Sequence, residues 1–216
     1  MAFHHALAPR TVTGLAEEPS PEALSLIHRP DCAAAVWHRK PSSAFTSWIN
    51  DVPQDQLPRA RMILHPNAIR DALSHICSIH DTPSGPQRDS LIDDITVLAD
   101  VFSQLVDAEM LRLRLDVATA NACRKFHIDA VTARLICTYR GTGTQLTNSP
   151  TAADPRDIHT VQTCSPIVLR GTDWPAHPSS ALRHRSPPIE GTGETRLLLV
   201  LDPVTEADAH DQHTLH

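Results

Sequence analysis

The sequence has few aromatic residues and no long apolar run. Its 216 residues include 3 Trp, 1 Tyr and 4 Phe. No apolar stretch approaches the roughly 18 residues that a transmembrane helix requires. The N-terminus does not show the basic region followed by an apolar region that marks a signal peptide. These absences argue against a membrane-spanning or secreted protein, and we expect a cytoplasmic one.

Paired cysteines and an excess of positive charge are also missing. The five cysteines are odd in number and form no Cys-x-x-Cys motif, a pattern typical of reduced thiols. The formal net charge is -6. A negative protein is not expected to use nucleic acid or an anionic membrane as its main partner.

The composition divides the chain into three regions. Residues 1–60 contain prolines at short intervals, so we expect an irregular N-terminal extension. Its only regular pieces are a possible strand at residues 33–39 and a short helix or turn at 43–50. Residues 61–203 are predicted to form a single α+β domain. Residues 204–216 form a His-rich tail that is expected to be flexible, and its metal affinity is either adventitious or a means of gathering a transition metal.

Within the predicted domain the apolar periodicity changes from helical to alternating. Helical spacing predicts helices over residues 67–80 and 89–106. Alternation then predicts strands at residues 111–117, 126–129, 134–139, 167–170, 181–185 and 196–202. Because no crossover helix separates these strands, the sheet should be mostly antiparallel. We therefore predict a helical layer packed on a β-sandwich or short barrel.

The richest pattern is His127-Ile-Asp129 followed by His184 and then Arg196. Two imidazoles and one carboxylate are the ligands of the facial triad that binds non-haem Fe(II) and leaves coordination positions open. Residues i and i+2 of a strand share a face, so His127 and Asp129 should point to one metal. The alternative to a metal site is a hydrogen-bonded His–Asp pair in a β-core, with Arg196 neutralising a buried carboxylate.

Arg196 should lie close to this metal if residues 181–201 form a hairpin around the Pro- and Gly-rich loop after His184. Its guanidinium matches the distal carboxylate of a 2-oxo acid. Thr138 and Tyr139 are further candidates for binding this cosubstrate, although core packing is the default for a half-buried tyrosine. Cys123 is a possible fourth metal ligand that would favour zinc, or else a small buried residue. No catalytic residue is predicted beyond the metal ligands.

Several segments carry a resemblance to a known family. They are residues 123–129, 134–139, 141–144, 169–171 with Trp174, 184–188 and 196–202, with 36–39 as an upstream extension. Together they resemble the bacterial family named domain of unknown function 1826 over most of residues 90–202. This resemblance implies no activity, but members of the family look to be associated with zinc-homeostasis genes.

The ligand pattern is also similar to that of double-stranded β-helix Fe(II)/2-oxoglutarate dioxygenases. That similarity implies a cupin-like jelly roll for the β-domain. The chain departs from both patterns: Gln145 and Leu146 replace an expected acidic and an expected aromatic residue, and Leu198 stands where a serine usually follows the arginine.

Three hypotheses follow. The leading one is an Fe(II)/2-oxoglutarate-dependent oxygenase-like protein in which His127, Asp129 and His184 bind the metal and Arg196 binds the 2-oxo acid. The second is a non-catalytic zinc-binding or zinc-homeostasis protein that uses the same cluster. The third is a β-domain that binds a protein partner and no metal. The substrate is not predicted.

Overall fold

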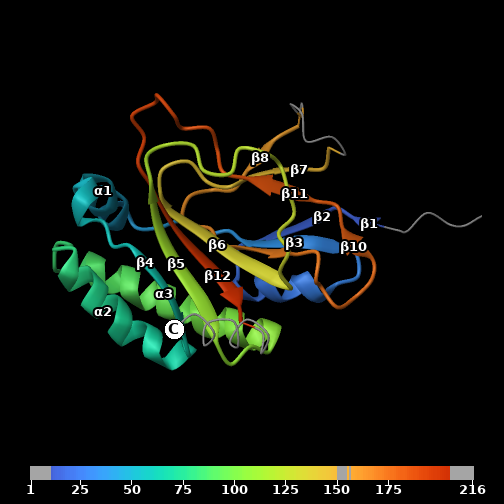
Figure 1. Ribbon diagram of the computed structural model, residues 1–216, viewed down its shortest axis with the longest axis horizontal. Coiled ribbons are helices and arrows are strands. Elements are labelled where there is room, and N and C mark those ends of the chain that lie inside the picture. Colours follow the sequence, from blue (N-terminus) through green and yellow to red (C-terminus); the bar gives the residue numbers. More distant parts are fainter. Residues whose placement is uncertain (1–10, 150–154, 156, 205–216) are drawn as a thin grey trace, which may run out of the picture.

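The computed structural model describes residues 11–149, 155 and 157–204 and has a mixed α/β fold (Figure 1). In chain order its elements are β1 (Thr11–Val12), β2 (Gly14–Glu18), the 3-10 helix η1 (Pro21–His28), β3 (Cys32–Trp37), α1 (Ser43–Asp51), η2 (Gln54–Gln56), β4 (Ala60–Leu64), η3 (Pro66–Ala68), α2 (Ile69–Ile79), α3 (Pro86–Val106), β5 (Leu111–Ala118), β6 (Ala133–Arg140), β7 (Gln145–Thr147), β8 (His159–Thr160), β9 (Ile167–Arg170), β10 (Ser179–Ser180), β11 (Arg183–Arg185) and β12 (Arg196–Pro203).

The strands form one large sheet and two smaller ones. Among the described residues, the large sheet has the order β2-β3-β9-β6-β12-β5-β4, and a three-stranded sheet has the order β11-β7-β8. β1 pairs with β10 alone. All neighbours in the large sheet are antiparallel except β2 and β3. The expectation of a mostly antiparallel sheet is therefore confirmed.

Helices α1, α2 and α3 cover one face of the large sheet (Figure 1). The long helix α3 begins with Pro86 at its first turn and ends before Asp107, which has a left-handed conformation. Its apolar stripe, including Phe102, is buried with Leu197, Leu199 and Leu201 of β12 in the main core. The alternating pattern of β12 thus directs every second residue toward the helices.

The opposite face of the large sheet packs against the small sheet. Val200 of β12 and Ile136 of β6 are buried together with Leu146 of β7 and the neighbouring Leu182. A second apolar cluster therefore fills the space between the two sheets. Polar residues that share the inner face of β6 and β12 with Ile136 and Val200 also face this space and line the candidate site.

The prediction of a largely irregular extension over residues 1–60 was wrong for its described part, although the short strand expected at 33–39 and the short helix expected at 43–50 occur as β3 and α1. β2 and β3 belong to the large sheet, and α1 packs against it. The prolines fall between these elements or, like Pro21, in the first turn of a helix, where a missing N–H costs nothing. Residues 1–10 and nearly all of the predicted tail, from 205 onward, lie outside the described residues.

The predicted strand at residues 126–129 is reduced to a single bridge between His127 and His184. The hairpin expected around residues 186–194 is also absent, since β11 pairs with β7 whereas β12 pairs with β5 and β6. His184 and Arg196 consequently stand on different sheets that face each other. Within the described part of the chain, no helix is both long and apolar enough to cross a bilayer.

Candidate metal centre

Both histidines of the predicted triad lie at the edge of the small sheet. His127 and His184 exchange backbone hydrogen bonds with N–O distances of 3.0 and 2.9 Å, and their ring centroids are 4.5 Å apart. On its other side His184 pairs with Leu146 of β7. The short segment that contains His127 thus extends the small sheet beyond β11.

Asp129 is held in place by the turn that follows β9. The backbone N–H of Thr172 donates to the Asp129 carbonyl oxygen at 2.9 Å. A Cβ atom on Gly171 would lie 1.8 Å from the carbonyl oxygen of Val131 and 2.9 Å from that of Asp129. Only glycine allows the two segments to approach this closely, so Gly171 fixes the backbone that presents the carboxylate.

The three predicted ligands converge. One ligand atom from each of His127, Asp129 and His184 lies within 4.8 Å of the other two. The Nε2 atom of His127 is 3.4 Å from Asp129 Oδ1, and that of His184 is 3.1 Å from Asp129 Oδ2. His127 Nδ1 lies 2.8 Å from the Lys125 carbonyl oxygen. Donation to this carbonyl would place the lone pair on Nε2, as in many metal-binding histidines.

These residues fit a divalent metal ion. Asp129 Oδ2 is buried and makes no hydrogen bond with the described residues, although the ring nitrogen of His184 is close by. A buried carboxylate oxygen without a donor is costly. An imidazole–imidazole–carboxylate set provides three ligands, which is the number that a catalytic non-haem iron site requires.

The electrostatics of the cluster favour its metal-binding protonation state. Burial lowers the pKa of His184 despite the opposing effect of Asp129, so its imidazole is neutral at pH 7. Burial alone would raise the pKa of Asp129, but its contacts with His184, Arg134 and His127 lower it to about 2. The cluster therefore offers the neutral imidazole of His184 and the ionised carboxylate of Asp129, the forms that bind metals.

Arg134 connects this carboxylate to the large sheet. Its Nη1 atom lies 2.6 Å from Asp129 Oδ1, and its Nε atom lies 2.6 Å from Asp202 Oδ1. Arg134 therefore forms ion pairs with two carboxylates, and no spacing along the chain indicates Asp202 as one of its partners. Alternation along β6 and β12, which puts Arg134 and Asp202 on the inner face, was the available signal.

Arg196 is buried on the inner side of the large sheet. It is 1% exposed, its Nε donates to the Thr142 carbonyl oxygen at 2.7 Å, and its Nη2 donates to the Thr138 hydroxyl at 3.4 Å. Burial lowers the pKa of Arg196 to about 10. No carboxylate of the described residues lies within ion-pair distance of it. A buried guanidinium with only neutral partners is costly unless an anion joins it.

The structure brings Thr138 to Arg196 but separates Tyr139 from it. The Tyr139 hydroxyl donates to Asp94 of α3 at 2.6 Å, and its ring is buried in the core beneath the helices. The prediction that Tyr139 binds a cosubstrate beside Thr138 was therefore wrong, because successive residues of a strand face opposite sides of the sheet.

Cys123 lies beside His127 but outside the three-ligand cluster. Its Sγ atom is 3.6 Å from His127 Nδ1, whereas the ring atom that faces Asp129 is Nε2. The thiol is thus on the side of the ring away from the carboxylate. The described residues therefore offer a three-ligand arrangement rather than a four-ligand one that includes Cys123.

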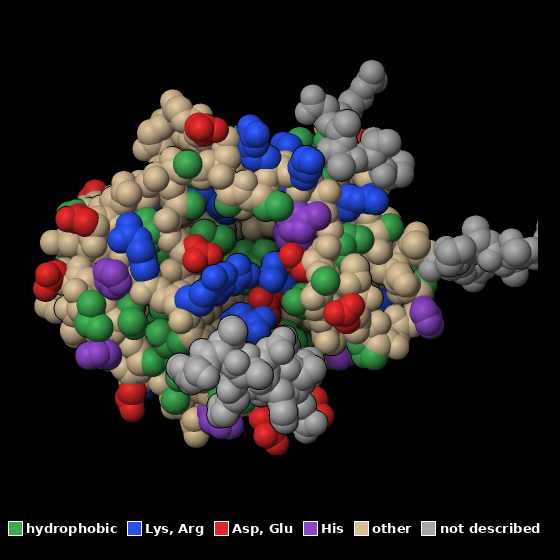
Figure 2. Space-filling view, viewed as in Figure 1, with side chains coloured by type: hydrophobic (Ala, Val, Ile, Leu, Met, Phe, Trp, Pro, Cys, Tyr) green, Lys and Arg blue, Asp and Glu red, His purple; other side chains and the backbone are tan. Residues whose placement is uncertain are grey.

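A cavity of about 430 Å³ opens in front of the two histidines, and its size is typical of ligand pockets. Its walls combine the histidine edge of the small sheet with inner-face residues of β5, β6 and β12, including Arg114, Ile136 and Leu198. Figure 2 shows the surface hollowed in this region, with blue Lys and Arg side chains gathered beside it.

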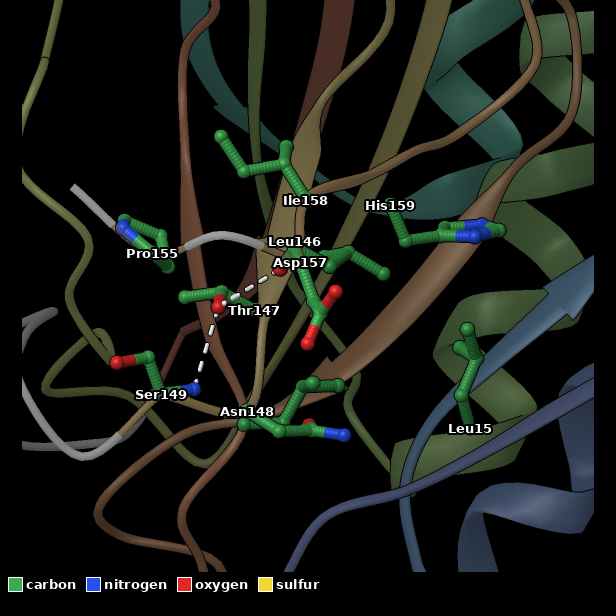
Figure 3. A pocket seen from close by; sticks show the side chains of 10 residues that line it. Leu15, Leu146, Thr147, Asn148, Ser149, Pro155, Asp157, Ile158 and His159 are labelled. Carbon is green, nitrogen blue, oxygen red and sulfur yellow. Dashed lines mark hydrogen bonds between the residues drawn. The ribbon is translucent and has the colours of Figure 1, made fainter.

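A larger cavity of about 680 Å³ lies elsewhere (Figure 3). Leu15, Leu146, Asp157 and His159 are among its lining residues, and the Thr147 hydroxyl there donates to the Asp157 carbonyl oxygen at 3.1 Å. None of the three candidate ligands lines it. Its size alone therefore does not make it the reactive site.

Comparisons with known proteins bear on the family and the fold. A model of the family described as "Protein of unknown function (DUF1826)" matches residues 18–202. Comparison with curated proteins gives no match. Among solved structures, the chain is similar to dioxygenase for auxin oxidation 1 from Arabidopsis thaliana in a 2-oxoglutarate binary complex. That match has 11% identity and a TM-score of 0.53, and it covers 89% of this chain and 92% of the other.

A second solved structure with the same description, the dioxygenase for auxin oxidation in rice, has 11% identity and a TM-score of 0.48, and the match covers 91% of this chain and 84% of the other. At this level of identity the Arabidopsis match shows a common fold. The resemblance to dioxygenases of this kind, expected from the sequence, is confirmed at the level of the fold.

Proposed function

The chain belongs to the DUF1826 family of proteins of unknown function, and we propose that it is an oxygenase dependent on Fe(II) and a 2-oxo acid. The observation that carries the proposal is the convergence of His127, Asp129 and His184 with a buried carboxylate oxygen that lacks a donor. The two facing sheets support a double-stranded β-helix, or jelly roll, as the core that holds this site.

The chain's own residues would divide the work as follows. The two imidazoles and the Asp129 carboxylate would hold a ferrous ion, which when bound would supply oxidation of the substrate by O2 coupled to decarboxylation of the 2-oxo acid. Arg134 orients Asp129 through its 2.6 Å contact with Oδ1. Because Arg134 occupies Oδ1, Oδ2 would be available as the ligand atom.

Arg196 would bind the distal carboxylate of 2-oxoglutarate. Its guanidinium is buried and hydrogen-bonds two neutral groups, the Thr142 carbonyl and the Thr138 hydroxyl, while the Glu194 carboxylate acts on it from beyond ion-pair distance. A carboxylate would restore charge balance through a charge-assisted hydrogen bond. Thr138 would then position the guanidinium or share the carboxylate. Leu198 and Val200, which line the cavity with the two histidines, would limit the access of water to it.

The metal part of the proposal is tested by metal content. Untagged protein loaded anaerobically with Fe(II) and desalted should retain about one ion per chain, and His184→Ala or Asp129→Ala should lose it. His159→Ala is the matched control, because this histidine is exposed and outside the cluster. Retention of iron by both ligand variants would exclude the proposed centre.

The cosubstrate part is tested with the iron-loaded protein. Adding 2-oxoglutarate anaerobically should produce the visible charge-transfer band of a chelated 2-oxo acid. Arg196→Ala should weaken its binding by about 10- to 100-fold, the value of a hydrogen bond to a charged group, while Arg196→Lys retains part of the affinity. An unchanged affinity of Arg196→Ala for 2-oxoglutarate would show that another residue binds the distal carboxylate.

A further inference from the structure

The inner face of the large sheet carries arginines beside the candidate metal centre. Arg61 of β4 and Arg114 of β5 are direct partners in the antiparallel register. Directly opposed residues project to the same face with Cβ atoms about 5 Å apart. Like charges in this arrangement repel each other, so the pair is destabilising unless an anion lies between or beside them.

The protein compensates the charge of Arg114 only partly. Its Nη2 atom is 3.5 Å from Asp202 Oδ2, but Asp202 is already bound by the Nε and Nη2 atoms of Arg134 at 2.6 and 2.9 Å. The Nε atom of Arg114 is buried and has no hydrogen-bond partner among the described residues. Burial, followed by the charge of Arg134, lowers the pKa of Arg114.

Arg61 is still less compensated. Its side chain is exposed, and no carboxylate of the described residues forms an ion pair with it. The acidic residue that accompanies this pair on the same face of β5 is Asp116, which is exposed at the rim of the cavity. The charges of Arg134 and Arg61 act on Arg114 together with those of Asp202 and Asp116. Three guanidinium groups thus face two carboxylates, so positive potential remains at this end of the cavity.

One arginine of this pair lines the cavity that contains the two histidines. Arg114 lines the cavity of about 430 Å³ together with His127 and His184, and its strand partner Arg61 lines the neighbouring cavity at β4. The side chains of Arg114 and the metal ligand Asp129 are also linked through Arg134, which contacts both Asp129 and Asp202. Arginine and lysine side chains can be seen gathered beside the hollow in Figure 2.

We propose that Arg61 and Arg114 form an anion-binding subsite that recognises a carboxylate or phosphate group of the substrate. The assignment of this anion to the substrate rests on the proposed function, in which the 2-oxo acid is bound elsewhere, by Arg196 of β12. With its anionic group held by the arginine pair, the substrate extends along the cavity toward the histidines. Neutral molecules of the same shape would leave Arg114 Nε unpaired and bind poorly.

The subsite can be tested without metal or cosubstrate. We would titrate metal-free protein with 4-fluorophenyl phosphate, 4-fluorobenzoate and the neutral 4-fluorobenzyl alcohol, following each by fluorine NMR. At least one anion should bind and the alcohol should not, and the preferred anion distinguishes a phosphate from a carboxylate site. Arg114→Ala should weaken anion binding about 10- to 100-fold.

Two further variants keep the test decisive. Arg61→Ala changes an exposed residue, so it should fold and still weaken anion binding severalfold. Arg59→Ala removes the same charge just before β4, from a side chain that donates to the Gln54 carbonyl, and should change the affinity less than twofold. Equal losses in Arg59→Ala and Arg61→Ala would reduce the effect to net charge and overturn the subsite.

The outcomes separate the two proposals. If Arg196→Ala abolishes anion binding and Arg114→Ala does not, the anion occupies the cosubstrate position and the inference fails. If the arginine pair binds anions while His184→Ala retains iron, the subsite stands and the oxygenase proposal fails. If iron binding depends on His184 but no anion binds, the oxygenase proposal remains and its substrate is not recognised through this pair.

Discussion

At the scale of single residues, the pKa of Asp129 is subject to opposing effects in the metal-free protein. Burial disfavours its ionised form, while His184, Arg134 and His127 favour it, and the balance lowers its pKa from 3.8 to about 2. A carboxyl group whose pKa is lower in the folded than in the unfolded state stabilises the fold above the unfolded value. This contribution is lost as the pH falls from 3.8 through about 2.

We predict that Asp129→Asn removes this acid-dependent stabilisation. Metal-free wild-type protein should lose about 2 kcal/mol of unfolding free energy from this group between pH 5 and pH 2. The variant should show a correspondingly smaller decline, because its amide does not titrate. Urea unfolding at a series of pH values measures the difference. Parallel pH dependence in the two proteins would show that Asp129 is not stabilised as an anion.

The residue scale also shows how far alternation alone predicts a site. The pattern at His127, Asp129 and His184 identified residues that do converge. Thr138 and Tyr139 were both assigned to the cosubstrate, although neighbours on one strand face opposite sides. A strict use of the alternation would have kept Thr138 and placed Tyr139 with the helices. Arg134 and Asp202 needed the pairing of β6 with β12, which no local pattern contains.

At the scale of elements, Asp94 attaches α3 to the sheet. It accepts a hydrogen bond from the Tyr139 hydroxyl of β6 and forms a two-pronged ion pair with Arg39, which follows β3. Arg39 also donates to the Cys164 carbonyl oxygen at 2.7 Å. One carboxylate of a helix thus binds two segments of the opposite layer directly, and Arg39 connects it to a third. The buried location raises the pKa of Tyr139 well above its usual value, so the phenol stays a donor.

We predict that Tyr139→Phe destabilises the protein without affecting the metal centre. The loss should be about 1–3 kcal/mol, because a hydrogen bond to a charged acceptor is removed in the core. Urea unfolding measures this loss, and anaerobic titrations measure the affinities for iron and 2-oxoglutarate. An unchanged stability combined with a weaker 2-oxoglutarate affinity would restore Tyr139 to the cosubstrate site.

The elements themselves were unequally predictable. The helical spacing around Phe102 and the alternation of β12 are dense local signals, and both elements occur near the predicted positions. β2 was missed because frequent prolines suggested breaks, whereas the prolines only separate short elements; β3 lies near the strand expected at residues 33–39. The hairpin between His184 and Arg196 failed for another reason: strand partners are chosen by long-range packing, which the spacing of residues along the chain does not encode.

At the scale of the whole molecule, metal binding should stabilise the fold. His127 and Asp129 lie on an irregular segment, His184 on the small sheet, and Arg134 joins them to the large sheet. A ligand that binds only the folded state raises its stability by about 2.7 kcal/mol at one hundred times its dissociation constant. Because the ligands come from separate segments, the gain should appear as a higher melting temperature of the entire domain.

We predict that saturating Fe(II) raises the anaerobic melting temperature by about 5–10 °C, given that 1 kcal/mol corresponds to roughly 2–4 °C for a chain of this size. A chelator should reverse the shift. Differential scanning calorimetry measures it, with His159→Ala as the responsive control and His184→Ala as the unresponsive variant. A shift of equal size in His184→Ala would trace the stabilisation to other metal-binding groups.

The segment that presents His127 has one more consequence, which concerns association between molecules. It runs along the free side of β11, where His127 bridges His184 and the Ser186 N–H donates to the Cys123 carbonyl oxygen. Unpaired strand edges are templates for pairing with another chain. The segment that contains His127 and Asp129 therefore also covers the edge of β11. Any change that detaches this segment would expose β11 to intermolecular pairing and aggregation.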